Sequence, residues 1–267
     1  MIIEDNVLIE LDKSDLKEIK NTGTIIIPND ITEIKEKVFI YNEHLKRIII
    51  PKSVKIIGER ALECPYLESI VVEDGNLVYD SRDNCNALIE TKTNTLLRGC
   101  ANTIIPNTVT VIDEIAFISC KGLKKIDIPE SVEEMRSEAF YGCSDLETIN
   151  IKGKLDRILF GTFSSCTSLK RITFPKDLKI IESEAFRSCL SLKYFDVPKG
   201  VREIEEYAFY ECDNLLLVTI PSSVKKVGVL AFPNNEKMVI NCDFNEKPSG
   251  WNNEWASGLK RVIWGRN

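Results

Sequence analysis

The stretch Ile128–Ile151, IPESVEEMRSEAFYGCSDLETINI, recurs with variations along most of the chain. A spacing of 23 residues separates Pro28 from Pro51, Pro106 from Pro129, Pro175 from Pro198, and Pro198 from Pro221. Pro129 and Pro175 are 46 residues apart, which is two copies with Lys152 at the missing proline. Pro51 and Pro106 are 55 residues apart, which is one copy plus an insertion of 32 residues. A unit this short cannot bury its own apolar side chains, so neighbouring copies must stack and share one core.

Repeat positions are numbered here from the proline, which is position 0. Positions 10 and 11 hold a small residue and an aromatic one, in Ala116-Phe117, Ala139-Phe140, Ala185-Phe186, Ala208-Phe209 and Ala231-Phe232. Position 14 holds Cys120, Cys143, Cys166, Cys189 and Cys212. Cys64 comes one residue early, which indicates a deletion of one residue in that copy. Positions 3, 6, 17, 20 and 22 are apolar, as in Val132, Met135, Leu146, Ile149 and Ile151, and are the predicted core.

The end of each copy, as in Ile149–Lys152, alternates apolar and polar residues, which is the period of a half-buried strand. We therefore expect one parallel β-strand per coil, stacked into a long sheet. Proline closes each strand because it has no N–H to donate. The Ala-Phe-x-x-Cys segment predicts a short helical turn or loop with the phenylalanine in the interior.

This pattern, Ile-Pro-x-x-Val-x-x-Ile-x-x-x-Ala-Phe-x-x-Cys-x-x-Leu-x-x-Ile-x-Ile, closely resembles the BspA-like leucine-rich repeat family over about Thr24 to Ile240. The resemblance implies an α/β repeat solenoid, a leucine-rich-repeat superhelix with capped ends. Several members of that family are bacterial adhesins toward host extracellular proteins. The resemblance thus implies protein binding at the cell surface or outside the cell, with no cofactor.

The composition excludes some partners. The net charge of −6 and the pI near 5.2 give no basis for binding nucleic acid. No run of 18 apolar residues exists, so we expect no membrane insertion. The start, MIIEDNVLIELDKSD, lacks the regions of a signal peptide, which fits an intracellular protein or a mature fragment.

Nine cysteines are an odd number, which argues against a complete disulfide framework. Six of them share one repeat position, which predicts buried free thiols that bond weakly to the backbone of the next coil. Cys85 and Cys100 could pair if the protein is secreted. No Cys-x-x-Cys pair is present, so a metal site is not expected.

The predicted organisation has three parts. Residues 1–23 form an N-terminal cap, residues 24–240 form the repeats, and residues 241–267 form a tryptophan-rich C-terminal cap. The insertion, residues 74–105, is expected to contain a β-hairpin of residues 87–90 and 95–98. Its Asp74, Asp80, Asp83 and Asn84 lack the spacing of a calcium loop. Trp251, Trp255 and Trp264 either seal the last coil or form a sugar-stacking platform.

Enzymatic chemistry has no support in the sequence. His44 is the single histidine, and no Gly-x-Ser-x-Gly, phosphate-binding or dinucleotide motif is present. We therefore predict a protein that is not an enzyme.

The candidate binding surface is the outward side of the predicted strands, at positions 18, 19 and 21, which we call the strand face. Seven basic side chains on it form a basic stripe, and four apolar residues accompany them. The basic stripe is Lys46, Arg47, Lys124, Lys125, Lys170, Arg171 and Lys193, and the apolar residues are Ile49, Val71, Tyr194 and Leu217. One interpretation is a ligand-binding face, and the other is the ordinary charge mixture of a soluble solenoid.

Three functional hypotheses follow. The favoured one is a monomeric solenoid that binds a protein partner through the strand face. The second is a structural spacer or scaffold without a ligand. The third is weak binding of a polyanion or carbohydrate through the basic stripe or the tryptophans.

Overall fold

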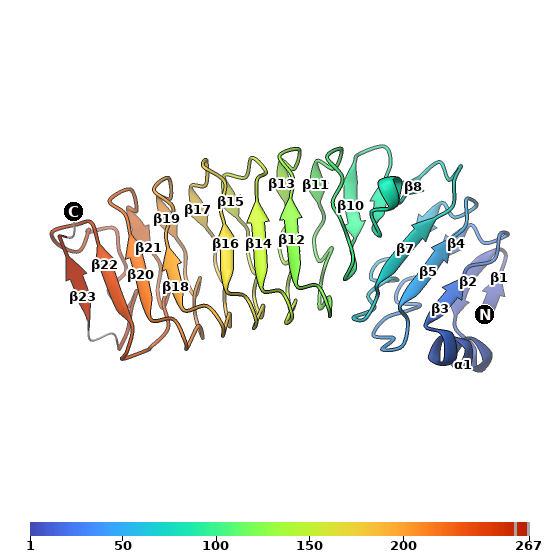
Figure 1. Cartoon of the computed structure of the whole chain (residues 1–267), viewed down its shortest axis with the longest axis horizontal. Coiled ribbons are helices and arrows are strands. Elements are labelled where there is room, and N and C mark those ends of the chain that lie inside the picture. The colour runs from blue at the N-terminus through green and yellow to red at the C-terminus, as the bar shows by residue number, and fades with distance from the viewer. Residues whose placement is uncertain (259–260, 266–267) are drawn as a thin grey trace.

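The computed structural model describes residues 1–258 and 261–265, and it shows an elongated β-solenoid with the termini at opposite ends (Figure 1). Most coils contribute a long strand at positions 19–22, in parallel register with the same positions of the next coil, although the strands Arg171–Thr173 and Tyr194–Asp196 belong to separate sheets. Lys125 pairs with Thr148 and Thr148 with Arg171, which is the 23-residue period of the sequence. The long strands are β3 (Thr24–Ile26), β5 (Arg47–Ile50), β7 (Ser69–Val72), β12 (Lys125–Ile128), β14 (Thr148–Ile151), β16 (Arg171–Thr173), β18 (Tyr194–Asp196), β20 (Leu217–Ile220), β22 (Val239–Cys242) and β23 (Val262–Trp264).

Most coils also contain a second, two-residue strand at positions 5 and 6, in addition to the one strand per coil that the repeat pattern predicts. These short strands pair in parallel along a second side of the solenoid. They are β4 (Glu33–Ile34), β6 (Ile56–Ile57), β11 (Val111–Ile112), β13 (Glu134–Met135), β15 (Arg157–Ile158), β17 (Ile180–Ile181), β19 (Glu203–Ile204) and β21 (Lys226–Val227). Two residues are too few to show an alternation, so only the pairing with neighbouring coils reveals them.

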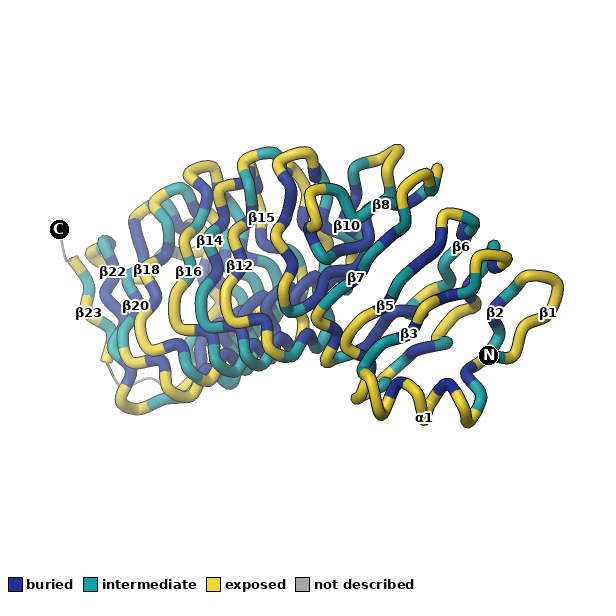
Figure 2. Tube along the Cα trace, turned by 45° about the vertical axis from the view of Figure 1, so that its right-hand side comes forward, coloured by how far each residue is buried: buried dark blue, intermediate teal, exposed yellow. Residues whose placement is uncertain are grey.

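The core lies where the repeat predicts it. In the quoted copy, Val132, Met135, Leu146, Ile149 and Ile151 are all at most 2% exposed. Figure 2 shows this buried interior beneath exposed turns. These predicted core positions are therefore confirmed, whereas the prediction of one shared core for the whole stack is wrong, because the described core forms two clusters.

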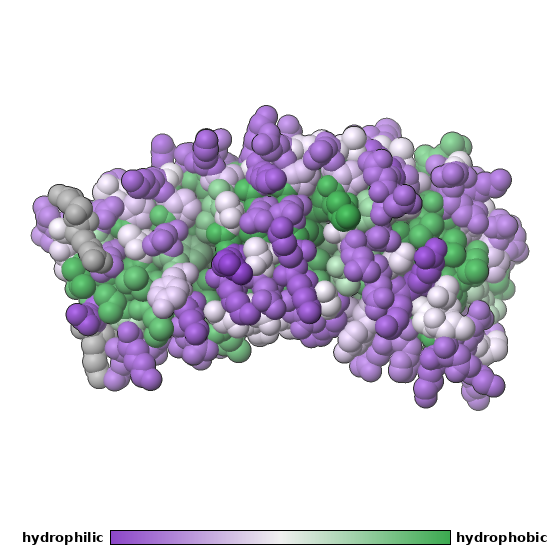
Figure 3. Space-filling view, in the orientation of Figure 1, coloured by the Kyte–Doolittle hydropathy of each residue, from purple (hydrophilic) through white to green (hydrophobic). Residues whose placement is uncertain are grey.

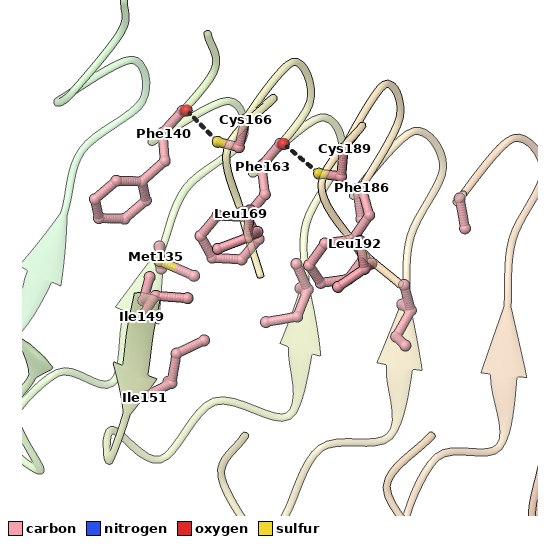
Figure 4. Close-up of a cluster of buried hydrophobic side chains, with 14 of the residues drawn as sticks. Met135, Phe140, Ile149, Ile151, Phe163, Cys166, Leu169, Phe186, Cys189 and Leu192 are labelled. Atoms are coloured by element: carbon pink, nitrogen blue, oxygen red, sulfur yellow. Dashed lines mark hydrogen bonds between the residues drawn. The ribbon is translucent and has the colours of Figure 1, made fainter. Parts of the chain in front are cut away.

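Phenylalanines at position 11 form a ladder along the axis. Phe140 stacks on Phe163 with ring centroids 5.6 Å apart (Figure 4) and on Phe117 at 4.7 Å. The ladder continues through Phe186, Phe209 and Phe232 and ends edge-on against Trp255. Aromatic pairs at such distances add stabilisation beyond their burial.

The cysteines are buried free thiols, as expected, but the direction of their hydrogen bonds was predicted wrongly. The Sγ of Cys166 donates to the carbonyl of Phe140 at 3.2 Å (Figure 4), and that of Cys143 donates to the carbonyl of Phe117 at 3.0 Å. The thiols of Cys143, Cys166, Cys189 and Cys212 thus bond to the preceding coil. Cys64 does the same with Phe39, so the early cysteine keeps its place despite the deletion.

The segment between the short strand and the cysteine is a turn without helix, and its shape depends on two left-handed residues per coil. Position 9 has a positive φ in Lys37, Arg60, Ile115, Glu138, Gly161, Glu184, Tyr207 and Leu230. Position 13 has a positive φ in Tyr41, Ser119, Gly142, Ser165, Ser188 and Glu211. L-residues with a side chain adopt this conformation at a cost, so the coil stacking must stabilise it.

The two ends of the stack are covered by different structures. At the N-terminus, β1 (Ile2–Glu4) and β2 (Val7–Glu10) form a hairpin, and β2 pairs with β4. Helix α1 (Lys13–Thr22) follows because Asp12 and Asp15 form a capping box, and it ends at Gly23 with φ 69°. At the C-terminus, Trp251 and Trp255 are buried and Trp264 packs against the core, which favours the sealing role over a sugar platform.

The insertion forms β8 (Tyr79–Asp80), a 3₁₀ turn η1 (Arg82–Asn84), and the predicted hairpin of β9 (Leu88–Glu90) and β10 (Thr95–Arg98). Its Asp80 is ion-paired with Arg82 at 2.6 Å, and Cys85 and Cys100 are separate buried thiols. Strand β10 pairs with β11, so the insertion joins the stack. The long strands do not pair across it, and β3, β5 and β7 are inclined to β12, β14 and β16 (Figure 1). The described core accordingly separates into two clusters at this junction.

Candidate functional site: the strand face

The alternation of the long strands decides what the strand face presents. In β12, Ile126 and Ile128 are buried whereas Lys125 and Asp127 are exposed. The same alternation in β18 exposes Tyr194 and Asp196 and buries Phe195. Every basic stripe residue is exposed, and the apolar residues Ile49, Val71 and Leu217 are half-buried. In Figure 3, hydrophobic residues show in patches between hydrophilic margins.

The junction divides the predicted site. Lys46, Arg47, Ile49 and Val71 belong to the sheet of β3, β5 and β7, in which Ile49 pairs in register with Val71. The remaining predicted residues lie on the larger segment beyond the insertion. The structure therefore does not bring all of them together into one continuous stripe.

Acidic residues of adjacent coils neutralise part of the stripe. Lys46 is 3.0 Å from Glu68, and Lys170 is 2.9 Å from Glu147. The hydrogen bond from Lys170 lowers the pKa of Glu147, and the charges of Lys170, Lys124 and Arg171 contribute in the same direction. Lys125 is paired with Asp127 within its own strand at 3.3 Å. In the part of the chain that the structure describes, Arg47, Lys124, Arg171 and Lys193 have no ion pair.

Four predicted residues converge in one place. Lys170, Arg171, Lys193 and Tyr194 line a hollow of about 580 Å³ together with Leu190, Ser191 and Asn214. We call it the Tyr194 hollow. Tyr194 is 64% exposed and Leu190 39% exposed, so an aromatic ring and an aliphatic side chain stand beside free cations. Leu217 pairs with Tyr194 in register and extends this surface.

Some residues of this surface were missed in the sequence. Leu190, Ser191 and Asn214 lie in the loops before the strands, where the repeat varies and carries no signal. Ile26 is 60% exposed at position 21 beside Ile49, and the alternation of the first strand could have identified it. A second hollow, of about 630 Å³, lies beside Lys125 and includes the exposed Ile104.

Within residues 1–258 and 261–265 the structure forms no cluster of metal-binding side chains. His44 is exposed in a turn. No group of three or more His, Cys, Asp or Glu side chains among the described residues is placed to hold a metal ion. Helix α1, the one α-helix in the described chain, is too short and too polar to cross a membrane.

The fold defines the class of protein, a leucine-rich-repeat solenoid. The sequence model of the BspA type leucine rich repeat region matches in six copies over residues 2–88, 94–215 and 179–253. The chain belongs to the BspA-type leucine-rich repeat family. This repeat fold is typically non-enzymatic.

Solved structures with the same fold come from bacteria. A leucine-rich repeat protein from Eubacterium ventriosum is 25% identical, with a TM-score of 0.61 over 85% of this chain and 66% of that one. A leucine rich cell surface protein from Faecalibacterium prausnitzii is 26% identical, with a TM-score of 0.52 over 90% of this chain and 53% of that one. The pneumococcal vaccine antigen PcpA shares the fold at 18% identity, with a TM-score of 0.57 over 91% of this chain and 68% of that one. No curated protein sequence matches the chain. The chain spans less than two thirds of the length of the first two structures.

Proposed function

We propose that this chain is a monomeric, non-enzymatic protein-binding module of a bacterial cell-surface or secreted protein. Membership of the BspA-type family and the cell-surface description of the 26% identical neighbour support this setting. The observation that carries the binding role is the Tyr194 hollow, in which exposed aromatic, aliphatic and cationic side chains converge.

The chemistry of the hollow indicates the kind of partner. Tyrosine and arginine are the residue types that contribute most to protein–protein binding, because they combine a large contact area with directed hydrogen bonds. Arg171 and Lys193 have no carboxylate partner within the described chain, so they are available to one on another protein. The preferred partner is therefore a protein surface with carboxylates around an apolar group.

The test uses immobilised chain incubated with host extracellular matrix proteins. The variant Arg171→Glu/Lys193→Glu reverses two charges in the hollow, and Lys199→Glu/Arg202→Glu reverses two exposed charges outside it. We expect a captured protein to bind the first variant at least about tenfold more weakly and the control like the wild type. Equal binding to the wild type and the hollow variant would refute this site. Capture of no protein would favour the spacer role. Polyanion binding would be favoured if no protein is captured and if the wild type, but not the hollow variant, is retained on heparin at low ionic strength.

A further inference from the structure

The edge of the solenoid that carries the Ala-Phe turns is held by a backbone ladder. In the coil that starts at Pro129, the N–H groups of Glu138, Phe140 and Gly142 donate to carbonyls of the next coil at 2.9, 3.0 and 2.8 Å. The same positions, 9, 11 and 13, donate to the next coil in the copies that start at Pro28, Pro106, Lys152 and Pro175. The turns are thus joined like strands of a parallel sheet.

This ladder is interrupted at the junction. Arg60 and Leu62 hold positions 9 and 11 of the coil before the insertion, and neither N–H has an acceptor among the described residues. On the opposite side, the carbonyl of Glu114 has no donor in the described chain, although the equivalent carbonyl of Glu59 accepts from Lys37 at 3.1 Å. Leu62 is buried and Arg60 half-buried, whereas Glu114 is exposed, so these unpaired backbone groups remain open to hydrogen bonds from an added chain.

The insertion fills only part of the gap. The N–H of Gly99 donates to Ala116 at 2.9 Å. The guanidinium of Arg98 reaches the carbonyl of Cys64 on one side and those of Ile115 and Ile118 on the other, at 3.3 to 3.4 Å. Arg98 is 6% exposed, and its Nε has no partner in the described structure. Arg98 therefore bridges the two segments without completing the ladder.

A cleft of about 540 Å³ lies at this gap, and we call it the junction cleft. One side is the Ile57–Glu63 segment and the other is the Asp113–Ile118 segment, with Leu88, Leu97 and Arg98 from the insertion. Aliphatic side chains from all three segments contribute to its lining, so it suits an occupant with apolar groups.

The junction cleft has an excess of negative charge. Glu63 is ion-paired with Arg60, and Asp113 with Arg136. Glu59, Glu114 and Glu138 also line the cleft, and none of them has an ion pair within the described residues. Burial raises the pKa of Glu138, and the charges of Glu114 and Glu184 add to this shift. A cation in the cleft would relieve this repulsion.

We propose that the junction cleft binds an extended peptide segment of a partner protein that carries a lysine or arginine. The peptide's carbonyls accept hydrogen bonds from the backbone N–H groups of Arg60 and Leu62. One of the peptide's N–H groups donates to the backbone carbonyl of Glu114, which completes the ladder. Its basic side chain lies among Glu59, Glu114 and Glu138. Addition of a strand to an open hydrogen-bonding edge is an established mode of peptide recognition.

A bare metal ion is a poor alternative occupant, since no three carboxylates of the described chain are grouped as metal ligands. A long basic side chain can reach carboxylates that are further apart. The junction cleft is separate from the Tyr194 hollow and shares no residue with it, so either site can fail without the other.

The test selects phage-displayed random heptapeptides on the immobilised protein and measures the selected peptides, made synthetically, by fluorescence anisotropy. We expect sequences with lysine or arginine beside aliphatic residues. The variant Glu114→Gln/Glu138→Gln should weaken their binding roughly tenfold, because it removes two charges from the cleft. The control Glu206→Gln/Glu254→Gln removes two exposed carboxylates outside the cleft, and should bind like the wild type.

Amide hydrogen exchange supplies a second readout that does not depend on charge. The bound peptide should slow exchange at Arg60 and Leu62, whereas Phe140 and Phe163, already bonded to the next coil, should not change. The proposal is overturned if the library yields no enriched sequence, if the cleft variant binds as tightly as the wild type, or if exchange at Arg60 and Leu62 is unaffected.

Discussion

Replacing Phe140 with alanine tests whether the phenylalanine ladder stabilises the solenoid. Phe140 is fully buried, and its ring stacks on Phe117 at 4.7 Å and on Phe163 at 5.6 Å. Loss of a buried phenylalanine side chain costs about 3–5 kcal/mol, because both the transfer energy and the packing around the cavity are lost. Each aromatic pair contributes about 0.5–1.5 kcal/mol of its own. We therefore expect a loss near the upper end, about 4–5 kcal/mol.

The assay is urea unfolding followed by circular dichroism, with tryptophan fluorescence as a second probe. Trp251 and Trp255 report on the C-terminal coils alone, so coincident transitions would show that the stack unfolds as a unit. Phe39→Ala is an informative comparison, since Phe39 is equally buried but Leu62 takes the aromatic position in the next coil. It should cost about 1–3 kcal/mol less, because the described structure gives Phe39 neither of the two aromatic pairs that Phe140 makes. Phe160→Ala, at a residue that is 42% exposed, is the control and should cost less than about 1 kcal/mol.

A loss below about 1.5 kcal/mol for Phe140→Ala, with an unchanged dependence on urea, would refute the reasoning. It would mean that neighbouring coils collapse into the space of the ring, so that the ladder is not a rigid core element.

Three further predictions concern stability. Lys37→Gly should raise the free energy of unfolding by about 0.5–1 kcal/mol, because Lys37 is exposed and has a φ of 60°. The control Lys35→Gly, at an exposed residue of the same turn with a negative φ, should lower the free energy of unfolding by a similar amount. A lower stability in both variants would contradict the role of the left-handed position. Gly99→Ala should destabilise the protein in thermal unfolding, because its new methyl group would overlap the ring of Phe117, and an unchanged melting temperature would show that the ring can move away. Stability should also be nearly constant between about pH 6 and pH 8 and fall above that range. Burial raises the pKa of Cys64 and Cys242 to about 12 in the folded protein. As the pH rises, these thiols therefore lose their protons first in the unfolded chain. This lowers the free energy of unfolding by up to ~1.4 kcal/mol per pH unit for each thiol. Urea unfolding at about pH 7.5 and at about pH 9.5 measures this loss of stability. The loss should be smaller in Cys143→Ala, because burial also raises the pKa of the Cys143 thiol. A stability that rises with pH would contradict this prediction.

Much of the candidate strand face could be predicted because alternation in a strand is local. Once Ile126 and Ile128 were assigned to the core, Lys125 and Asp127 had to point outward, and the structure exposes them. The hollow beside Tyr194 could not be predicted, since Leu190 and Asn214 reach it from loops of two different coils. Its shape depends on how adjacent coils are placed, and the local pattern does not encode that.

The sequence by itself determined the period, the register, the core positions and the family, because an apolar residue recurring every 23 positions can be buried only by stacking equal coils. The tertiary structure alone decided the second, two-residue strands, the direction of the thiol hydrogen bonds and the break at the insertion. Each of these depends on contacts between residues about one coil or more apart. Such contacts form only when the coils are stacked, and the junction cleft exists because one coil lacks its regular neighbour.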